Sequence, residues 1–278
     1  MTQLAHFSDL HLLEADHQAR RGVARRRLSY LTLGRPNDHE DRRRRASRAL
    51  AVARASGADH VLITGDLTED GLDAQFDVLA ELLADSKLAP ERITLLAGNH
   101  DAYVDRAAFA RALLGPLRPY AATSTAGTPI TLRDAVILPL STAMAQPYTR
   151  SAGSIDVDAL AAVEAIAAQS HREGRALVVA MHHPPKRRFP VMQWIDGLVE
   201  HAAMGAILAR HDHVHVAHGH IHTRTDHAVR PGATPRIFGA AAVVDAEAPV
   251  RFYEARHGRM WPAPEQGWTG TVRTPAMA

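Results

Sequence analysis

Short apolar runs recur along the chain, and most of them end in a polar turn. These runs predict buried strands over residues 4–8, 60–64, 92–97, 129–132, 135–138, 176–181, 213–216, 236–244 and 250–256. Apolar residues at helical spacing predict helices over 41–56, 73–85, 105–114, 158–172 and 193–210. The alternation of strands and helices indicates parallel strands covered by helices. Arg133-Asp134 predicts a hairpin turn, which would make the second half of the sheet antiparallel.

Polar residues with metal-binding chemistry follow the ends of five of these strands. They are Asp9 and His11, Asp66, Asn99 and His100, His182, and His220 and His222. The central stretch is Gly98-Asn99-His100-Asp101, in which Gly98 lets the chain turn sharply after its strand. Because the carboxyl ends of parallel strands meet at one edge of a sheet, we expect these side chains to lie together.

Two groups of histidines leave the choice of ligands partly open. His182 is followed by His183-Pro184-Pro185, and only one of the two histidines needs to be a ligand. Further on, His213 and His215 alternate with valines, so we expect them to share one face of a strand in a structural role. His220 and His222 flank Ile221 at the end of that strand and are the predicted ligands.

The composition narrows the chemistry further. The 278 residues include no cysteine, so a metal would be held by His, Asp, Glu or Asn. The formal charge of +2 gives no reason to expect a nucleic acid polymer as partner. No apolar run reaches the ~20 residues of a membrane span. The first residues lack the basic and apolar regions of a signal peptide, which predicts a cytoplasmic location.

No repeat or linker divides the sequence, so we expect a single domain over 1–278 with a peripheral tail over 259–278. Residues 12–45 are the least regular part of the chain and contain ten arginines. Two interpretations stay open for it: solvated helix faces with a loop, or a basic flap that attracts an anionic substrate or a membrane surface. Glu69 and Asp70 are expected to cap or solvate their loop.

The candidate ligands are too many for one tetrahedral zinc site. They suit two metals about 3.5–4 Å apart that share one carboxylate. Such a pair would polarise a bridging water to hydroxide and stabilise charge on a phosphoryl group, which predicts hydrolysis of a phosphate ester. Nitrogen and oxygen ligands accept manganese, iron or zinc, divalent or of mixed valence. The oligomeric state stays open, a homodimer included.

Together the motifs resemble those of the calcineurin-like metallophosphoesterases: Asp9-Leu10-His11, Gly65-Asp66, Gly98-Asn99-His100-Asp101, His182 and Gly219-His220-Ile221-His222. The resemblance implies a four-layer α/β/β/α sandwich of two mixed sheets, with a dimetal site at the strand ends. It assigns Asp9, His11 and His222 to one metal and Asn99, His182 and His220 to the other, with Asp66 bridging. It also implies that His100 faces the substrate, as transition-state stabiliser or general acid, and that Asp101 fixes its ring.

Within the family, the motifs at 8–11, 65–71 and 182–185 are most similar to the bacterial cyclic-nucleotide (class III) phosphodiesterases. That resemblance implies a phosphodiesterase acting on a small substrate such as a cyclic nucleotide or a glycerophosphodiester. The insertion at 12–45 departs from the short form of this region, and its arginines could bind a further phosphate or a phospholipid head group. The alternatives are a phosphomonoesterase or nucleotide pyrophosphatase and, in a different class, a non-catalytic binding scaffold.

Overall fold

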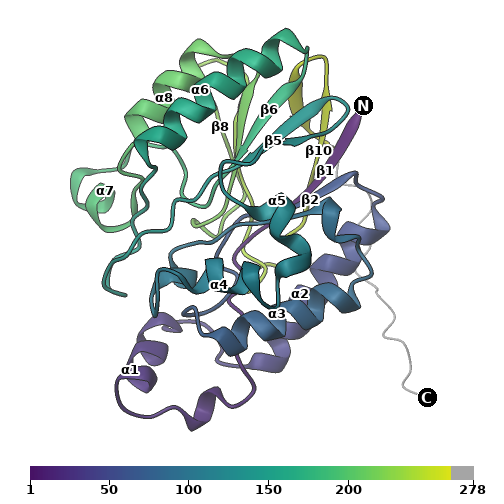
Figure 1. Cartoon of the computed structure of the whole chain (residues 1–278). Helices are drawn as coiled ribbons and strands as arrows, with labels where there is room; N and C mark the ends of the chain where they lie inside the picture. The colour runs from purple at the N-terminus through teal and green to yellow at the C-terminus, as the bar shows by residue number, and fades with distance from the viewer. Residues whose placement is uncertain (264–278) are drawn as a thin grey trace.

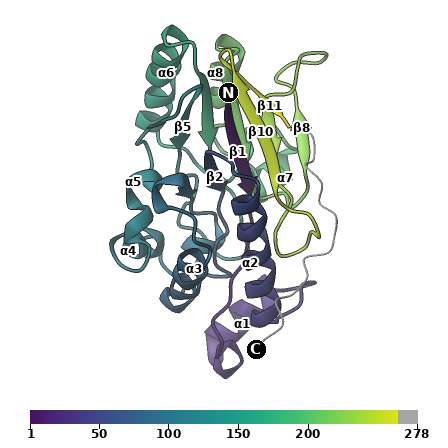
Figure 2. The same cartoon turned by 90° about the vertical axis from the view of Figure 1, so that its right-hand side faces the viewer.

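The computed structural model describes residues 1–263 and contains two mixed sheets. The first has the strand order β11-β10-β1-β2-β3, and the second has the order β4-β5-β6-β7-β9-β8. The strands of the first sheet are β1 (Thr2–Phe7), β2 (His60–Ile63), β3 (Ile93–Leu95), β10 (Arg251–Arg256) and β11 (Arg259–Pro262). Those of the second are β4 (Ile130–Thr131), β5 (Ala135–Pro139), β6 (Ala176–Ala180), β7 (Val214–His218), β8 (Thr225–His227) and β9 (Ile237–Gly239). Figure 2 shows β1 running between β2 and β10.

Helices cover the outer faces of the two sheets, with α2 and α3 on one side and α6 and α8 on the other (Figure 1). On the side of the first sheet lie α1 (Gly22–Leu31), α2 (His39–Ala55), α3 (Asp73–Asp85), α4 (Ala108–Leu114) and α5 (Ala121–Ser124). On the side of the second lie α6 (Val157–Arg172) and α8 (His201–Arg210), while α7 (Pro190–Asp196) stands apart from both sheets (Figure 1). Short 3-10 turns complete the chain: η1 (His17–Ala19), η2 (Pro90–Arg92), η3 (His100–Ala102) and η4 (Arg118–Tyr120). Among the described residues, no helix is both long and apolar enough to span a membrane.

The strands alternate their side chains between two cores, and this alternation creates the layers. In β1, Ala5 and Phe7 pack with residues of α2 and α3, whereas Leu4 faces the second sheet. In β7, Val214 and Val216 pack against α6 and α8, whereas Ala217 faces the first sheet. The result is the expected four-layer α/β/β/α sandwich, which the structure confirms.

The parallel strands bring their carboxyl ends to one edge of the sandwich. In the first sheet, β1, β2 and β3 are parallel; in the second, β5, β6, β7 and β9 are parallel. The predicted hairpin at Arg133-Asp134 is confirmed by the antiparallel pair β4 and β5, but the expectation that the second half of the sheet is antiparallel is wrong. Antiparallel pairing is limited to β4 and β8 there, and to β10 and β11 in the first sheet.

Three predicted elements differ from the structure. The helix expected over 193–210 is two helices, because Gly197 has extended backbone and a Cβ there would lie 2.4 Å from Gln193 Nε2. The strand expected over 236–244 stops at Gly239, after which Ala242 and Val243 bond to the loops of the metal-binding edge. The tail expected over 259–278 begins with the edge strand β11, and residues 264–278 lie outside the described part.

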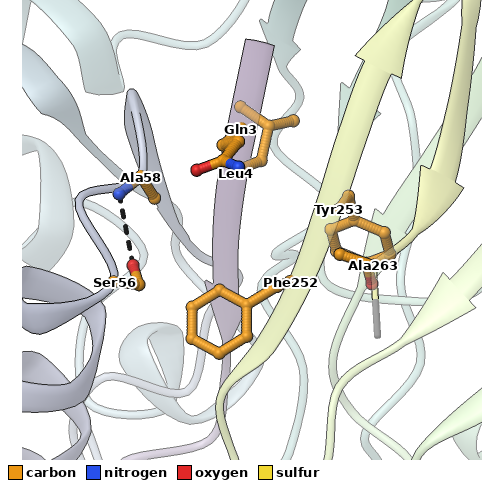
Figure 3. A pocket seen from close by; sticks show the side chains of 7 residues that line it. All are labelled: Gln3, Leu4, Ser56, Ala58, Phe252, Tyr253 and Ala263. Carbon is orange, nitrogen blue, oxygen red and sulfur yellow. Dashed lines mark hydrogen bonds between the residues drawn. The ribbon is translucent and has the colours of Figure 1, made fainter. Parts of the chain in front are cut away.

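A small hollow lies at the opposite end of the first sheet (Figure 3). It is lined by Gln3, Leu4, Ser56, Ala58, Phe252, Tyr253 and Ala263. Gln3 and Leu4 lie near the start of β1, and Ser56 and Ala58 precede β2. The hollow is therefore at the opposite end of these strands from their carboxyl ends. The hollow contains none of the predicted site residues.

Candidate metal centre

The strand-end residues predicted from the sequence converge at the carboxyl edge of the sandwich. They follow β1, β2 and β3 in one sheet and β6 and β7 in the other. Five of them have positive φ: Asp9 at 57°, His11 at 49°, Asp66 at 47°, His220 at 72° and His222 at 55°. Left-handed backbone is uncommon outside glycine and persists only where the surrounding structure holds it. Backbone strain is therefore concentrated at this edge of the sandwich.

Two glycines leave the space that the converging loops need. A Cβ on Gly98 would lie 2.1 Å from Asp66 Oδ1, and one on Gly219 would lie 1.9 Å from Ser8 Oγ. Gly98 itself does not have a positive φ. Its role is to make room for the Asp66 carboxylate, rather than to permit the sharp turn expected from the sequence.

The first group of donors consists of Asp9, His11 and His222, whose ligand atoms lie within 4.8 Å of one another. Nε2 of His11 and Nε2 of His222 are 3.2 Å apart, and His222 Nε2 is 3.5 Å from Asp9 Oδ1. His222 Nδ1 donates to Asp245 Oδ2 at 2.5 Å. In a neutral ring this leaves the Nε2 lone pair facing the other two side chains.

The second group centres on His182. Its Nδ1 donates to the Thr64 carbonyl at 2.7 Å, while its Nε2 lies 3.2 Å from Asn99 Oδ1 and 3.3 Å from Asp66 Oδ2. Burial opposes the charged form of His182, but the Asp66 carboxylate raises its pKa to about 9. The acceptors around Nε2 thus favour a positive charge at this point.

Asp66 lies between the two groups, and His220 completes the second. Oδ2 of Asp66 is 3.3 Å from His182 and 3.8 Å from His11 Nε2. Although Asp66 is buried, the neighbouring His182 and His100 hold its pKa well below the usual range. His220 clusters with His182 and His183 and donates from Nε2 to the Asp196 carbonyl at 2.9 Å. One carboxylate therefore lies within reach of both donor groups.

Comparison with known proteins agrees with this arrangement. The family model described as calcineurin-like phosphoesterase matches residues 2–224, most of the chain. The chain belongs to the calcineurin-like phosphoesterase family. No curated protein sequence matches it.

Solved structures share the fold at low sequence identity. A dimetal phosphatase from Danio rerio superposes with a TM-score of 0.65 at 12% identity, over 94% of this chain and 98% of that one. The protein TT1561 of Thermus thermophilus gives 0.56 at 11% identity, over 94% and 98%. A putative 5'-nucleotidase from Staphylococcus aureus, in complex with alpha-ketoglutarate, gives 0.51 at 13% identity, over 96% of this chain and 55% of that one. At this identity the likeness supports the fold alone.

The calcineurin-like phosphoesterases are dimetal-dependent, and the donor set of this member fits two metals. Lone pairs of His11 and His222 face each other, and those of His182, Asn99 and Asp66 meet at a second point. A cation between such acceptors removes their mutual repulsion. The donors are nitrogen and oxygen atoms, which suits first-row transition metals.

His183 differs from His182 in that both of its ring nitrogens have protein partners. Nδ1 lies 2.8 Å from Thr142 Oγ1, and Nε2 lies 3.0 Å from the Ser151 carbonyl. The ring packs 4.4 Å from that of His220. This arrangement favours His182 as the ligand and His183 as a support for His220.

The outer partners of the donors include residues that the sequence analysis missed. Asp245 holds His222, and Oε2 of Glu69 lies 3.6 Å from His11 Nδ1. Asp245 follows a short strand far along the chain, where nothing in the local pattern points to the site. The only clue to Asp245 in the sequence is that a carboxylate follows another predicted strand.

His100 faces Asp66, but Asp101 does not hold its ring. His100 Nδ1 lies 2.6 Å from the Glu69 carbonyl, and Nε2 lies 4.0 Å from Asp66 Oδ2. The Asp101 carboxylate instead accepts from the backbone amides of Leu67, Thr68 and Gly98 at 2.8–3.1 Å. The expectation that Asp101 orients His100 is therefore wrong: Asp101 ties together the loops that carry Asp66 and Asn99.

Glu69 and Asp70 are fully buried, which overturns the expectation that they solvate the loop. Glu69 pairs with Arg35 at 2.9 Å and with Arg42; Asp70 pairs with Arg20 and Arg27, both at 2.8 Å. A buried carboxylate needs such partners. Four of the arginines in 12–45 are therefore part of an internal ion-pair network rather than solvated helix faces.

His213 and His215 lie away from the metal centre, but they do not share a face. His213 precedes β7 and donates through Nε2 to the Ala167 carbonyl of α6, 2.8 Å away. His215 points between the sheets, where Nε2 accepts from the Met260 amide at 3.0 Å. The prediction that the two histidines share a face is wrong because His213 lies before β7, which begins at Val214.

Proposed function

We propose that the protein is a dimetal-dependent phosphodiesterase that hydrolyses a small substrate, such as a cyclic nucleotide or a glycerophosphodiester. The observation that carries the proposal is the convergence of two donor groups on Asp66, with His100 beside them. One metal would be held by Asp9, His11 and His222. The other would be held by Asn99, His182 and His220, and Asp66 would bind both metals. The two metals, manganese, iron or zinc, would activate water and stabilise charge on the phosphoryl group.

We assign to His100 the donation of a proton to the leaving group. Its Nδ1–H is engaged by the Glu69 carbonyl, so Nε2 is the nitrogen that faces the site. The side chain is 12% exposed, which leaves it accessible from the substrate side. A protonated Nε2 would pass its proton to the departing alkoxide as a general acid.

Arg35 is the member of the 12–45 insertion that reaches the donor groups. Its Nη1 lies 3.0 Å from His11 Nε2, and its Nη2 lies 2.9 Å from Glu69 Oε1. A metal held by His11 Nε2 would take the place of this contact, and the freed Nη1 would then be suited to bind a phosphoryl oxygen of the substrate. This supports the interpretation of the insertion as a substrate-binding flap.

The same site would also serve a phosphomonoesterase or a nucleotide pyrophosphatase. The structural neighbours named as a dimetal phosphatase and a putative 5'-nucleotidase favour keeping this alternative. A single domain, a cytoplasmic location, a homodimer and a phospholipid contact through 12–45 remain predictions. The scaffold alternative is weakened because every predicted ligand position is filled.

A comparison of two model substrates tests the proposal. Metal-stripped protein reconstituted with manganese is assayed on bis(p-nitrophenyl) phosphate and on p-nitrophenyl phosphate. The variant His100→Ala is assayed alongside, with His171→Ala as a surface-histidine control. We expect the diester to be preferred. Preference for the monoester would replace the proposal with a phosphatase, and no hydrolysis by fully metal-loaded protein would favour the scaffold.

A further inference from the structure

Helix α7 has its apolar side chains outside. None of its seven residues is buried. Phe189, just before the helix, is 83% exposed, Val191 is 70% exposed and Trp194 is 65% exposed. Met192 and Val199 extend this apolar surface. A helix that packed on the sandwich would bury these residues, so their exposure requires an explanation.

The polar side chains of α7 point the other way and anchor the helix. Gln193 accepts from the Arg188 amide at 2.9 Å and donates to the Leu198 carbonyl at 2.6 Å. The Asp196 carboxylate pairs with Arg188 at 2.9 Å. The exposed orientation of the apolar face is therefore fixed by hydrogen bonds on the inner side.

Positive charge stands beside the apolar face. Lys186 and Arg187 precede it and are exposed, and the stretch from Lys186 to Ile195 contains no carboxylate. The pattern of cations next to Phe, Val and Trp is that of a segment that lies in the interface of a membrane with anionic lipids. At seven residues, α7 can only lie on such a surface.

The helix is joined directly to the metal centre. The Asp196 carbonyl accepts from His220 Nε2 at 2.9 Å, and the Ile195 carbonyl accepts from the Ser151 amide at 2.8 Å. Arg150 donates to the Trp194 carbonyl at 2.8 Å and lies over the Trp194 ring at 5.1 Å. Figure 1 shows α7 on the outside of the molecule, away from both sheets.

We infer that α7 and Lys186–Arg188 form a docking surface for an anionic phospholipid membrane. The apolar side chains would enter the head-group region while Lys186 and Arg187 meet the lipid phosphates. A second copy of the chain fits less well, because a symmetric contact would bring the exposed Lys186 and Arg187 of the two copies together. The one carboxylate of this surface, Asp196, is already paired with Arg188. Docking through α7 would hold the metal centre beside the membrane. This inference does not rest on the proposed phosphodiesterase activity.

Co-sedimentation of the metal-loaded full chain with lipid vesicles tests whether α7 docks on an anionic membrane. The vesicles contain phosphatidylcholine alone or phosphatidylcholine mixed with phosphatidylglycerol. We expect binding to the anionic vesicles, weakened by salt, and at least about tenfold weaker partitioning for Phe189→Ser/Trp194→Ser. Arg187→Glu should also weaken partitioning, by about fivefold or more. Leu114→Ser and Arg106→Glu are the matched controls, since both residues are exposed on or near α4.

Several results would overturn the inference. One is wild-type protein that stays in the supernatant with anionic vesicles at low salt. Another is an apolar variant that binds as well as the wild type. A third is a dimer, seen by light scattering, that the same variant converts to monomer, which would assign the face to a second copy. Because sedimentation does not depend on turnover, failure here is distinguishable from failure of the proposed function.

Discussion

At the scale of single residues, the metal-binding edge keeps non-glycine residues in left-handed backbone. Asp9 and His11 share this conformation across one intervening residue, as do His220 and His222. Such residues cost of order 1–3 kcal/mol each. Backbone hydrogen bonds offset the strain: the amides of Asp9 and His11 bind the carbonyls of Gly65 and Asp66 at 3.0 and 2.9 Å. These backbone hydrogen bonds between loops thus help to hold the donor geometry.

His100→Ala should separate catalysis from metal binding. The ring lies beside Asp66 but outside the two donor groups that we assign to the metals. We expect kcat to fall about 10²–10⁴-fold, the usual contribution of a general acid, while metal content by elemental analysis stays at the wild-type value. Loss of metal together with activity would instead make His100 a ligand.

Asp245→Asn should weaken one metal site through His222. The Asp245 carboxylate accepts from His222 Nδ1 and thereby orients the ring. Removing such a partner typically costs about 10–100-fold in metal affinity. Competition with a chelator measures this, with the exposed Asp85→Asn on α3 as control. Equal metal affinity in both variants would show that Asp245 does not position the ligand.

At the scale of elements, the 12–45 insertion is fastened to the loop after β2. Four of its arginines meet the buried carboxylates of Glu69 and Asp70, and Gln75 donates to Glu14 at 2.8 Å. The loop also carries Asp66 and accepts from His100. The insertion therefore braces the metal-binding edge: Arg42 donates to the His11 carbonyl, and Arg35 reaches the His11 ring.

Arg42→Met should destabilise the fold. Arg42 and Glu69 are both buried, and removing the cation leaves the carboxylate with Arg35 as its remaining arginine partner. We expect the free energy of unfolding to fall by about 3 kcal/mol, the lower end for breaking a buried ion pair. Urea unfolding measures it.

Two variants make that experiment decisive. Arg44→Met on the same helix, where the side chain is 70% exposed, should change the free energy of unfolding by less than about 0.5 kcal/mol. Arg42→Met/Glu69→Gln should recover part of the loss, since the unpaired charge is gone. A single variant as stable as the wild type would show that the pair contributes nothing.

At the scale of the whole molecule, buried histidines should make the fold sensitive to acid. Burial lowers the pKa of His60 to about 4 and that of His215 to about 3, below the ordinary value of 6.5. Between pH 6.5 and about 4 the unfolded chain binds protons that the folded chain excludes, so stability falls as the pH falls. Each residue contributes about 1.4 kcal/mol per pH unit in that range.

His60→Gln tests this contribution, since it removes one titrating group far from the metal centre. Urea unfolding across this pH range should show a pH slope smaller by about one proton than that of the wild type. An unchanged slope would mean that His60 keeps its proton in the folded state.

Local patterns predicted most of the elements. The helix over 73–85 is confirmed residue for residue, because its apolar stripe is continuous and packs on a single core. The single helix over 193–210 is wrong because its apolar residues serve different partners: those of α8 enter the core, whereas those of α7 face outward. Periodicity shows that a face is apolar but not what covers it.

By itself, the sequence determined which strand ends carry metal-binding chemistry, since each motif lies within a few residues of its strand. It also determined the family, because the five motifs occur together in one order. Only the tertiary structure decided the partners: Glu69 rather than Asp101 beside His100, Asp245 behind His222, and arginines of the insertion on Glu69 and Asp70. The physical reason is that such partners are set by how distant loops pack at one sheet edge, which no local pattern records.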